Sequence, residues 1–329
     1  MPYLPSKQER EGTVSRREFL GRAAAWSAGL AASAAPARPG AVEKGAQPAA
    51  ARLGGPVFGA GSDPERLARA HKQLGYAAAY CPPARAGDLD RVRAIRKAFA
   101  REGIVIAEVG RWVNLLARDP KERKANLERV AEGLALAEEA GALCCVDIVG
   151  SFHPNVWYGP HPKNISRECF DAAVENARKI IDAVKPRRAK FCYEMMGWTI
   201  PDSPDAYLEL IRAVDRKAFG AHLDPCNLIN SPRRFYDNAA VIRECFRKLG
   251  PWIVSCHAKD LAWKIEMNVH FLEVRPGLGQ IDYKTYLREL ARLPHRPPLM
   301  MEHLSKAEDY AAAAAFIRKT GREIGVAVS

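Results

Sequence analysis

The stretch Trp252-Ile-Val-Ser-Cys-His-Ala-Lys-Asp260 begins as a short apolar run and ends in three groups that water solvates well. Its β-branched residues indicate a strand. A buried strand has no reason of its own to end in His257, Lys259 and Asp260, because burying polar groups without partners costs free energy. We therefore interpret this stretch as a strand that delivers side chains to a functional site.

Similar apolar runs alternate with longer amphipathic segments along most of the chain. The expected strands are residues 56–60, 76–81, 104–109, 143–150, 189–195, 219–224, 253–258 and 298–303. The expected helices are residues 64–74, 88–101, 120–140, 167–184, 204–214, 238–249, 283–293 and 306–318. This alternation predicts an α/β fold, the (β/α)₈ TIM barrel. A doubly wound open sheet is the alternative, but it usually carries a G-x-G-x-x-G turn, which this sequence lacks.

The last four expected strands each end in an ionisable side chain, namely Glu194, Asp224, His257 and Glu302. Strand residues that share the parity of Glu194, Asp224 and His257 are more polar than those of the other parity, so these side chains are expected to point into the barrel. Consecutive strands are neighbours, and active sites of such barrels lie at the C-terminal strand ends. The sequence therefore predicts that the four residues bind one divalent metal ion. Three carboxylates and one imidazole suit Mn²⁺, Mg²⁺ or Co²⁺ better than a structural Zn²⁺.

The N-terminal region has a different composition. Ser15-Arg16-Arg17-Glu18-Phe19-Leu20 precedes an Ala-rich run, a pattern typical of a twin-arginine export signal. The run is too short and too weakly apolar to span a membrane. We therefore expect a signal peptide over residues 1–37, a linker over residues 38–52 and the barrel over residues 53–329. The mature protein is expected in the periplasm or another extracytoplasmic compartment.

The chain is basic, with 50 Lys+Arg against 38 Asp+Glu and a formal net charge of +12. The basic residues are scattered along the expected helices, which favours a solvated surface over a nucleic-acid site. We therefore expect a small-molecule partner, no nucleic acid and no membrane span in the mature protein.

The chain resembles the xylose isomerase-like TIM barrels, specifically the sugar isomerase/epimerase branch, over roughly residues 53–320. The matching stretches are Glu194, the Leu-Asp-Pro segment with Asp224, His257-Ala-Lys-Asp260, Arg275-Pro-Gly-Leu-Gly279 and Glu302. The resemblance implies a divalent ion, most often Mn²⁺, at the four strand-end residues. It also implies that Glu194 and Glu302 act as an acid/base pair, moving a proton next to a metal-chelated carbonyl/hydroxyl pair of a carbohydrate. A homo-oligomer is expected as well.

Further residues are expected around this site. Substrate contacts are expected from Glu108, Trp112, His153, Trp198, Asn227, Lys259, Asp260 and Arg275. His222 lies one layer beneath Asp224 on the same strand face, where it is expected to orient the Asp224 carboxylate by a hydrogen bond. The segment 261–279 is expected to form a lid.

Two departures from the family pattern keep other reactions open. Asn227 stands where family members often have a histidine, and an amide cannot shuttle a proton at neutral pH. Together with the long segment 261–279, this leaves a lyase or dehydratase as the alternative, acting by β-elimination on a 3-keto glycoside or keto-polyol. An abasic-site endonuclease shares the barrel but needs several more His ligands. A non-catalytic sugar-binding protein is expected to lack one of the two glutamates.

Overall fold

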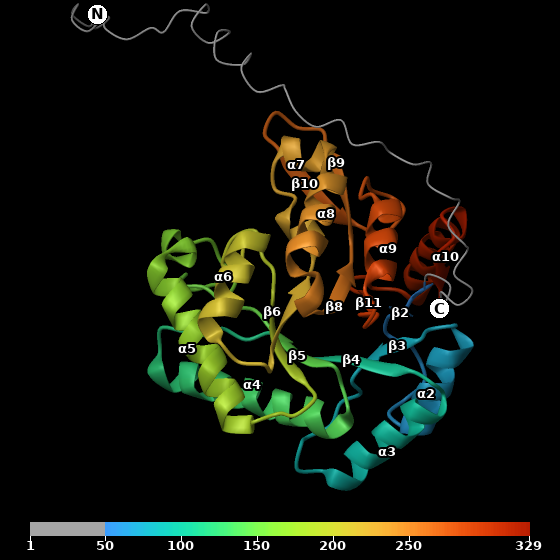
Figure 1. Cartoon of the computed structure of the whole chain (residues 1–329), viewed down its shortest axis with the longest axis horizontal. Helices are drawn as coiled ribbons and strands as arrows, with labels where there is room; N and C mark the ends of the chain where they lie inside the picture. The colour runs from blue at the N-terminus through green and yellow to red at the C-terminus, as the bar shows by residue number, and fades with distance from the viewer. Residues whose placement is uncertain (1–49) are drawn as a thin grey trace, which may run out of the picture. The chain divides into compact units, whose positions relative to one another are not determined.

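The computed structural model describes residues 50–329 of the chain (Figure 1). The expected signal peptide, and residues 38–49 of the expected linker, lie outside the described residues. Ala50–Ala51, the next two linker positions, form strand β1, which pairs in parallel with β12 (Ala327–Val328). The two ends of the described region therefore lie side by side.

Eight parallel strands close into a barrel, in the order β11-β2-β3-β4-β5-β6-β7-β8. This confirms the predicted TIM barrel. The strands are β2 (Leu53–Gly54), β3 (Ala78–Tyr80), β4 (Val105–Gly110), β5 (Cys144–Asp147), β6 (Lys190–Glu194), β7 (Phe219–Leu223), β8 (Ile253–Ala258) and β11 (Leu299–Met301). In this closed order, β4 and β8 stand on opposite sides of the barrel, because three strands separate them in either direction.

Helices surround the barrel (Figure 1). They are α2 (Pro64–Gln73), α3 (Leu89–Arg101), α4 (Pro120–Ala140), α5 (Arg167–Val184), α6 (Pro204–Val214), α7 (Pro232–Tyr236), α8 (Asn238–Leu249), α9 (Tyr283–Arg292) and α10 (Ala307–Glu323). Asp63 and Ser203 begin α2 and α6 by accepting a backbone N–H with their side chains, which is the usual role of Asp and Ser at this position. Within residues 50–329, no helix is both long and apolar enough to cross a membrane.

The first barrel strand is not where the sequence pattern predicted it. Residues 56–60 form a loop, and β2 lies earlier, at Leu53–Gly54. A side chain at Gly54 would come within 2.6 Å of both Ala78 O and Met300 Sδ. Glycine therefore allows β2 to pass close to its neighbours. Because glycine has no side chain, a search for apolar runs does not identify this segment as a strand. Phe58, expected in the strand, is instead half exposed and packs beside Tyr310.

Strand residues alternate between two packing environments. On β6, Phe191 and Tyr193 belong to the main core, whereas Cys192 faces inward with Cys144 and Val146. Because side chains alternate along a strand, Glu194 shares the inward parity of Cys192. The interior direction expected for Glu194 is therefore observed.

The segment expected to form a lid contains a β-hairpin. Strands β9 (Asp260–Lys264) and β10 (His270–Val274) pair antiparallel. The hairpin packs on α7 through an aromatic cluster in which the Phe235 and Phe271 rings stack at 4.8 Å and Tyr236 stacks on Trp263 at 5.4 Å. Figure 1 shows α7 and the hairpin together on one side of the molecule.

Candidate metal centre

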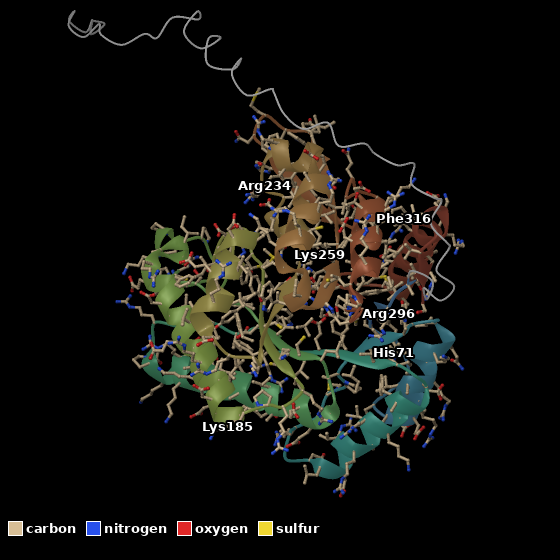
Figure 2. The ribbon with its side chains drawn as sticks, in the orientation of Figure 1. His71, Lys185, Arg234, Lys259, Arg296 and Phe316 are labelled. Carbon is tan, nitrogen blue, oxygen red and sulfur yellow. The ribbon has the colours of Figure 1, made fainter. Side chains whose placement is uncertain are left out.

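A cavity of about 790 Å³ opens at the C-terminal ends of the strands. The buried or nearly buried Glu108, Glu194, Lys259 and Glu302 reach it from the barrel interior. Lys259, labelled in Figure 2, lies near the middle of the ribbon. Aromatic side chains line much of the rest of the cavity: Tyr80, Trp112, Trp157, Tyr158, Trp198 and Tyr310.

The four predicted metal ligands converge. Nδ1 of His257 lies 3.0 Å from Glu194 Oε1, 2.8 Å from Glu302 Oε1 and 3.7 Å from Asp224 Oδ2. One ligand atom from each of the four residues lies within 4.8 Å of the others. Neighbouring ligands held at about 2.1 Å from one octahedral ion are about 3 Å apart, so this spacing fits a divalent cation.

The polar atoms of the cluster support the same conclusion. Asp224 Oδ2 and Glu302 Oε1 are buried, and neither accepts a hydrogen bond of good geometry from a described residue. The charged group nearest to both oxygens is the Lys259 ammonium, at 2.8 and 2.7 Å, so the two oxygens lie where a positive charge is stabilised. The four residues can therefore hold a divalent metal ion.

Lys259 lies inside this cluster. Its Nζ is 2.8 Å from Asp224 Oδ2, 2.7 Å from Glu302 Oε1 and 3.6 Å from Glu194 Oε1. Burial alone would lower the pKa of Lys259, but the three carboxylates raise it well above its usual range. The ammonium group therefore stays charged and neutralises part of the acidic site.

His222 does not orient Asp224 as the sequence suggested. Its Nε2 lies 2.9 Å from Glu108 Oε2 instead, and the other Glu108 oxygen lies 3.3 Å from Nε2 of His257. Asp224 lies two residues further along the chain, whereas Glu108 on β4 reaches His222 across the barrel interior. Burial alone would raise the pKa of Glu108, but His222 and His257 lower it to about 2. Glu108 is thus a buried carboxylate between two histidines.

The predicted substrate residues divide into two groups. Glu108, Trp112, Trp198, Asn227 and Lys259 line the cavity. The Nδ2 of Asn227 donates to Glu194 Oε1 at 3.2 Å and to Met195 O at 3.0 Å, so this amide positions a predicted ligand.

Asp260, Arg275 and His153 do not line this cavity. The Asp260 carboxylate accepts four backbone N–H bonds, from Leu261, Gly277, Gly279 and Ile281, and so fixes the base of the hairpin. Arg275 pairs with Asp309 at 3.5 Å. Nδ1 of His153 accepts two backbone N–H bonds of its own loop. Asp260 and Arg275 therefore hold backbone and surface contacts that sequence spacing does not reveal, whereas His153 lines a second hollow beside this cavity.

Glu273 and His303 line the cavity but were not predicted. His303 Nδ1 lies 3.0 Å from Glu273 Oε1, so the hairpin is joined to the barrel rim beside Glu302. His303 has φ of 60°, a left-handed conformation that is uncommon for residues with a side chain. The position of His303 directly after Glu302 could have indicated that it lies at the cavity. No feature of the sequence indicated the same for Glu273.

The protein is thus a TIM barrel with a candidate metal centre. Three carboxylates and one histidine form this centre at the C-terminal ends of the strands. Residues 50–320 match the sequence model of a family described as Xylose isomerase-like TIM barrel. Because this match covers far more than half of the 329 residues, the chain belongs to the xylose isomerase-like TIM barrel family. No curated protein matches the sequence.

Solved structures share the fold at low sequence identity. A xylose isomerase-like TIM barrel protein from Mycobacterium smegmatis, in complex with magnesium, is 17% identical with a TM-score of 0.59, covering 85% of this chain and 99% of that chain. Endonuclease IV from Thermus thermophilus is 16% identical with a TM-score of 0.60, covering 83% and 99%. The 3-keto-D-glucoside 4-epimerase from E. coli is 12% identical with a TM-score of 0.58, covering 81% and 98%. These likenesses show the fold alone, because one fold hosts many chemistries.

Proposed function

We propose that the protein is a divalent-metal-dependent sugar isomerase or epimerase, with Mn²⁺ as the preferred ion and Mg²⁺ or Co²⁺ as substitutes. The observation that carries the proposal is the convergence of Glu194 and Glu302 on Nδ1 of His257, at 3.0 and 2.8 Å, beside an aromatic-lined cavity. The two glutamates come from the ends of β6 and β11, strands that are separated by β7 and β8 in the barrel. They can therefore approach one substrate carbon from different sides.

The chemistry follows from these groups. A divalent ion held by Glu194, Asp224, His257 and Glu302 would supply Lewis-acid polarisation of a substrate carbonyl. One glutamate then accepts the proton from the carbon between the carbonyl and the neighbouring hydroxyl, and the other returns a proton. The Lys259 ammonium, 2.7 Å from Glu302, provides positive charge where negative charge develops on the substrate. Asn227 holds the Glu194 carboxylate in place and moves no proton.

The test replaces each glutamate by its isosteric amide. Glu194→Gln and Glu302→Gln are expected to keep the fold and to lower turnover by roughly 10²–10⁴-fold, the usual contribution of a general acid or base. Glu132→Gln is the matched control, because Glu132 pairs with Arg111 at 2.6 Å outside the cavity. Near-normal turnover in both active-site variants would defeat the proposal.

The reaction type is tested by incubation with sugars and 3-keto glycosides in deuterated water, with Mn²⁺ present. Deuterium entering one carbon without bond cleavage is expected for an isomerase or epimerase. Exchange accompanied by loss of a C–O bond would instead identify the lyase or dehydratase alternative. Duplex DNA with an abasic site is included in the same panel, and no cleavage is expected.

The metal itself is tested by elemental analysis of protein expressed in the cytoplasm. Asp224→Ala removes one carboxylate ligand and is expected to lower the bound metal well below that of the unaltered protein. Equal metal content in the two proteins would contradict the metal assignment.

We further propose that the chain is exported by the twin-arginine route, on the strength of Arg16-Arg17 and the Ala-rich run that follows. Protein recovered from outside the cytoplasm is expected to begin near residue 38. Replacing both arginines by lysine should retain the full-length protein in the cytoplasm. Export that persists in this variant would argue against the route.

A further inference from the structure

We propose that the substrate has two units, a reacting sugar joined to a second neutral sugar or similar hydroxyl-rich group, and that the second unit occupies a hollow beside the main cavity. This inference rests on the proposed function for the reacting unit. It concerns the part of the substrate that Glu194 and Glu302 do not touch.

The hollow lies next to the main cavity at the mouth of the barrel and measures about 1180 Å³. Its walls come from the loop after β4 and the loop after β5, including Asn114, Arg118, Phe152 and Asn155. Trp157 lines both the main cavity and this hollow. Trp157 therefore borders both spaces, and its ring is within reach of a ligand in either one.

The loop that carries Trp157 is held in place by buried polar groups. Asn164 is fully buried, donates from Nδ2 to Gly159 O at 3.0 Å and accepts from Phe152 N at 3.0 Å. Ser151 Oγ also donates to Gly159 O, at 2.6 Å. Because these bonds are shielded from water, they fix the two ends of the loop against each other. Trp157 lies between these fixed ends.

Trp157 has the character of a sugar platform. Its side chain packs edge-on against Tyr158, with ring centroids 5.1 Å apart, yet the residue remains 38% exposed. Aromatic faces combined with a few polar groups are typical of sites for small polar ligands. The exposed ring lies where the two hollows meet, so it can pack against the second unit of a ligand.

The hollow carries charges of both signs, with Arg118, Arg123 and Lys163 beside Asp119 and Glu122, and such a mixed lining suits a neutral hydroxyl-rich unit. Lys163 is paired with Glu168 at 2.9 Å, and Arg123 donates to Ala117 O at 3.3 Å. Asp119 and Glu122 line the hollow beside these cations. An anion would meet carboxylates as well as cations there, whereas a sugar can use both as hydrogen-bond partners.

The experiment measures binding rather than turnover. The full protein, loaded with Mg²⁺, is titrated by calorimetry with glucose, galactose and xylose, each compared with its methyl glycoside and a disaccharide that contains it. At least one disaccharide is expected to bind about tenfold more tightly than both the free monosaccharide and its methyl glycoside, which lacks a second unit. If no pair shows tighter binding of the larger ligand, the inference is overturned.

Variants assign the difference to Trp157. Trp157→Ala is expected to lower disaccharide affinity much more than monosaccharide affinity and so to remove most of the tenfold advantage, whereas Trp157→Phe retains part of it. Trp252→Ala is the matched control, since Trp252 is 37% exposed but precedes β8, at the opposite end of the barrel. Equal loss for both ligand sizes in Trp157→Ala would overturn the inference.

The binding result is independent of the catalytic assignment. Full turnover in Glu194→Gln and Glu302→Gln would defeat the proposed acid/base pair while leaving the measured preference for a larger ligand in place. Loss of turnover in those variants, with no preference for a larger ligand, would instead defeat the second subsite alone.

Discussion

The carboxylate of Glu108 lies 3.3 Å from Nε2 of His257, on the side of the ring opposite to the carboxylates that Nδ1 faces. A histidine that donates its Nε2–H to a carboxylate keeps the Nδ1 lone pair available for a cation. His222 Nε2 lies 2.9 Å from the other Glu108 oxygen and contributes to the lowered pKa of Glu108, which keeps that carboxylate ionised. Glu108 therefore contacts His257 through the ring nitrogen that does not face Glu194 and Glu302.

This relationship predicts the effect of removing Glu108. Glu108→Ala leaves Nε2 of His257 without its partner, so metal affinity is expected to fall about 10–100-fold, as is usual when such an outer carboxylate is lost. Glu108→Gln, which keeps an oxygen beside Nε2, should lose less. Titration of metal-free protein with Mn²⁺, followed by electron paramagnetic resonance, measures the affinity.

Asp147→Asn provides the matched control. Asp147 is also fully buried, on the strand next to β4, and its Oδ1 accepts the Val113 N–H at 2.9 Å. Burial raises the pKa of Asp147 well above its usual range, so Asn closely mimics the neutral acid. Equal Mn²⁺ affinity in Glu108→Ala and Asp147→Asn would contradict the role of Glu108.

Lys259 is predicted to compete with the metal. Lys259→Met removes the cation from among three carboxylates, so the metal-free protein should lose about 3–5 kcal/mol of stability, as when one partner of a buried ion pair is removed. The melting temperature should then rise more on adding Mn²⁺ than it does in the unaltered protein, because the metal replaces the lost positive charge. Thermal unfolding with and without Mn²⁺ measures both effects.

Lys248→Met tests whether the effect of Lys259 depends on its location. Lys248 also pairs with two carboxylates, those of Asp205 and Glu244, each at 2.6 Å, but these carboxylates are exposed. Its loss should therefore cost at most about 1 kcal/mol and leave the Mn²⁺ response unchanged. An identical Mn²⁺ response in all three proteins would refute the competition.

Asp260 is predicted to stabilise the hairpin rather than to bind substrate. Asp260→Ala deprives four buried or half-buried backbone N–H groups of their acceptor, with an expected cost of about 3 kcal/mol. Hydrogen–deuterium exchange should speed up at residues 261–281 and stay unchanged in β6 and β7. Asp119→Ala, which removes only the helix cap that accepts the Lys121 N–H, should leave the hairpin protected.

His71 is predicted to make stability depend on pH. Burial lowers the pKa of His71, whose Nδ1 lies 2.8 Å from Leu67 O, so the folded state keeps the ring neutral. Below the ordinary pKa of about 6.5, the unfolded chain takes up a proton that the folded protein does not. This contribution to stability is therefore present above pH 6.5 and is lost as the pH falls, by at most about 1.4 kcal/mol per pH unit.

The measurement compares urea unfolding at pH 7 and pH 5.5. His71→Gln keeps a donor for Leu67 O and should show a smaller fall in the free energy of unfolding between the two pH values. His295→Gln serves as the control, because His295 also contacts a backbone carbonyl, Ile253 O at 2.8 Å, but lies at the surface. The same fall in the unaltered protein and in His71→Gln would rule out the buried imidazole as its source.

The pattern of strands and helices in the sequence was sufficient to predict the barrel and the convergence of Glu194, Asp224, His257 and Glu302. Strand and helix periods depend on local geometry, and parallel βα units place consecutive strand ends side by side. Parity and strand order therefore suffice to bring these four residues to one end of the barrel interior.

The contacts between side chains across that interior could not be predicted from the sequence. Glu108 on β4 contacts His257 from the opposite side of the barrel. It also contacts His222, which was predicted from the sequence to hydrogen-bond to Asp224. Such contacts depend on the tilt and stagger of the strands, which no local pattern encodes. The roles of Asp260 in the hairpin and of Glu273 at the cavity could not be predicted either. Both depend on how the chain packs after the strands end.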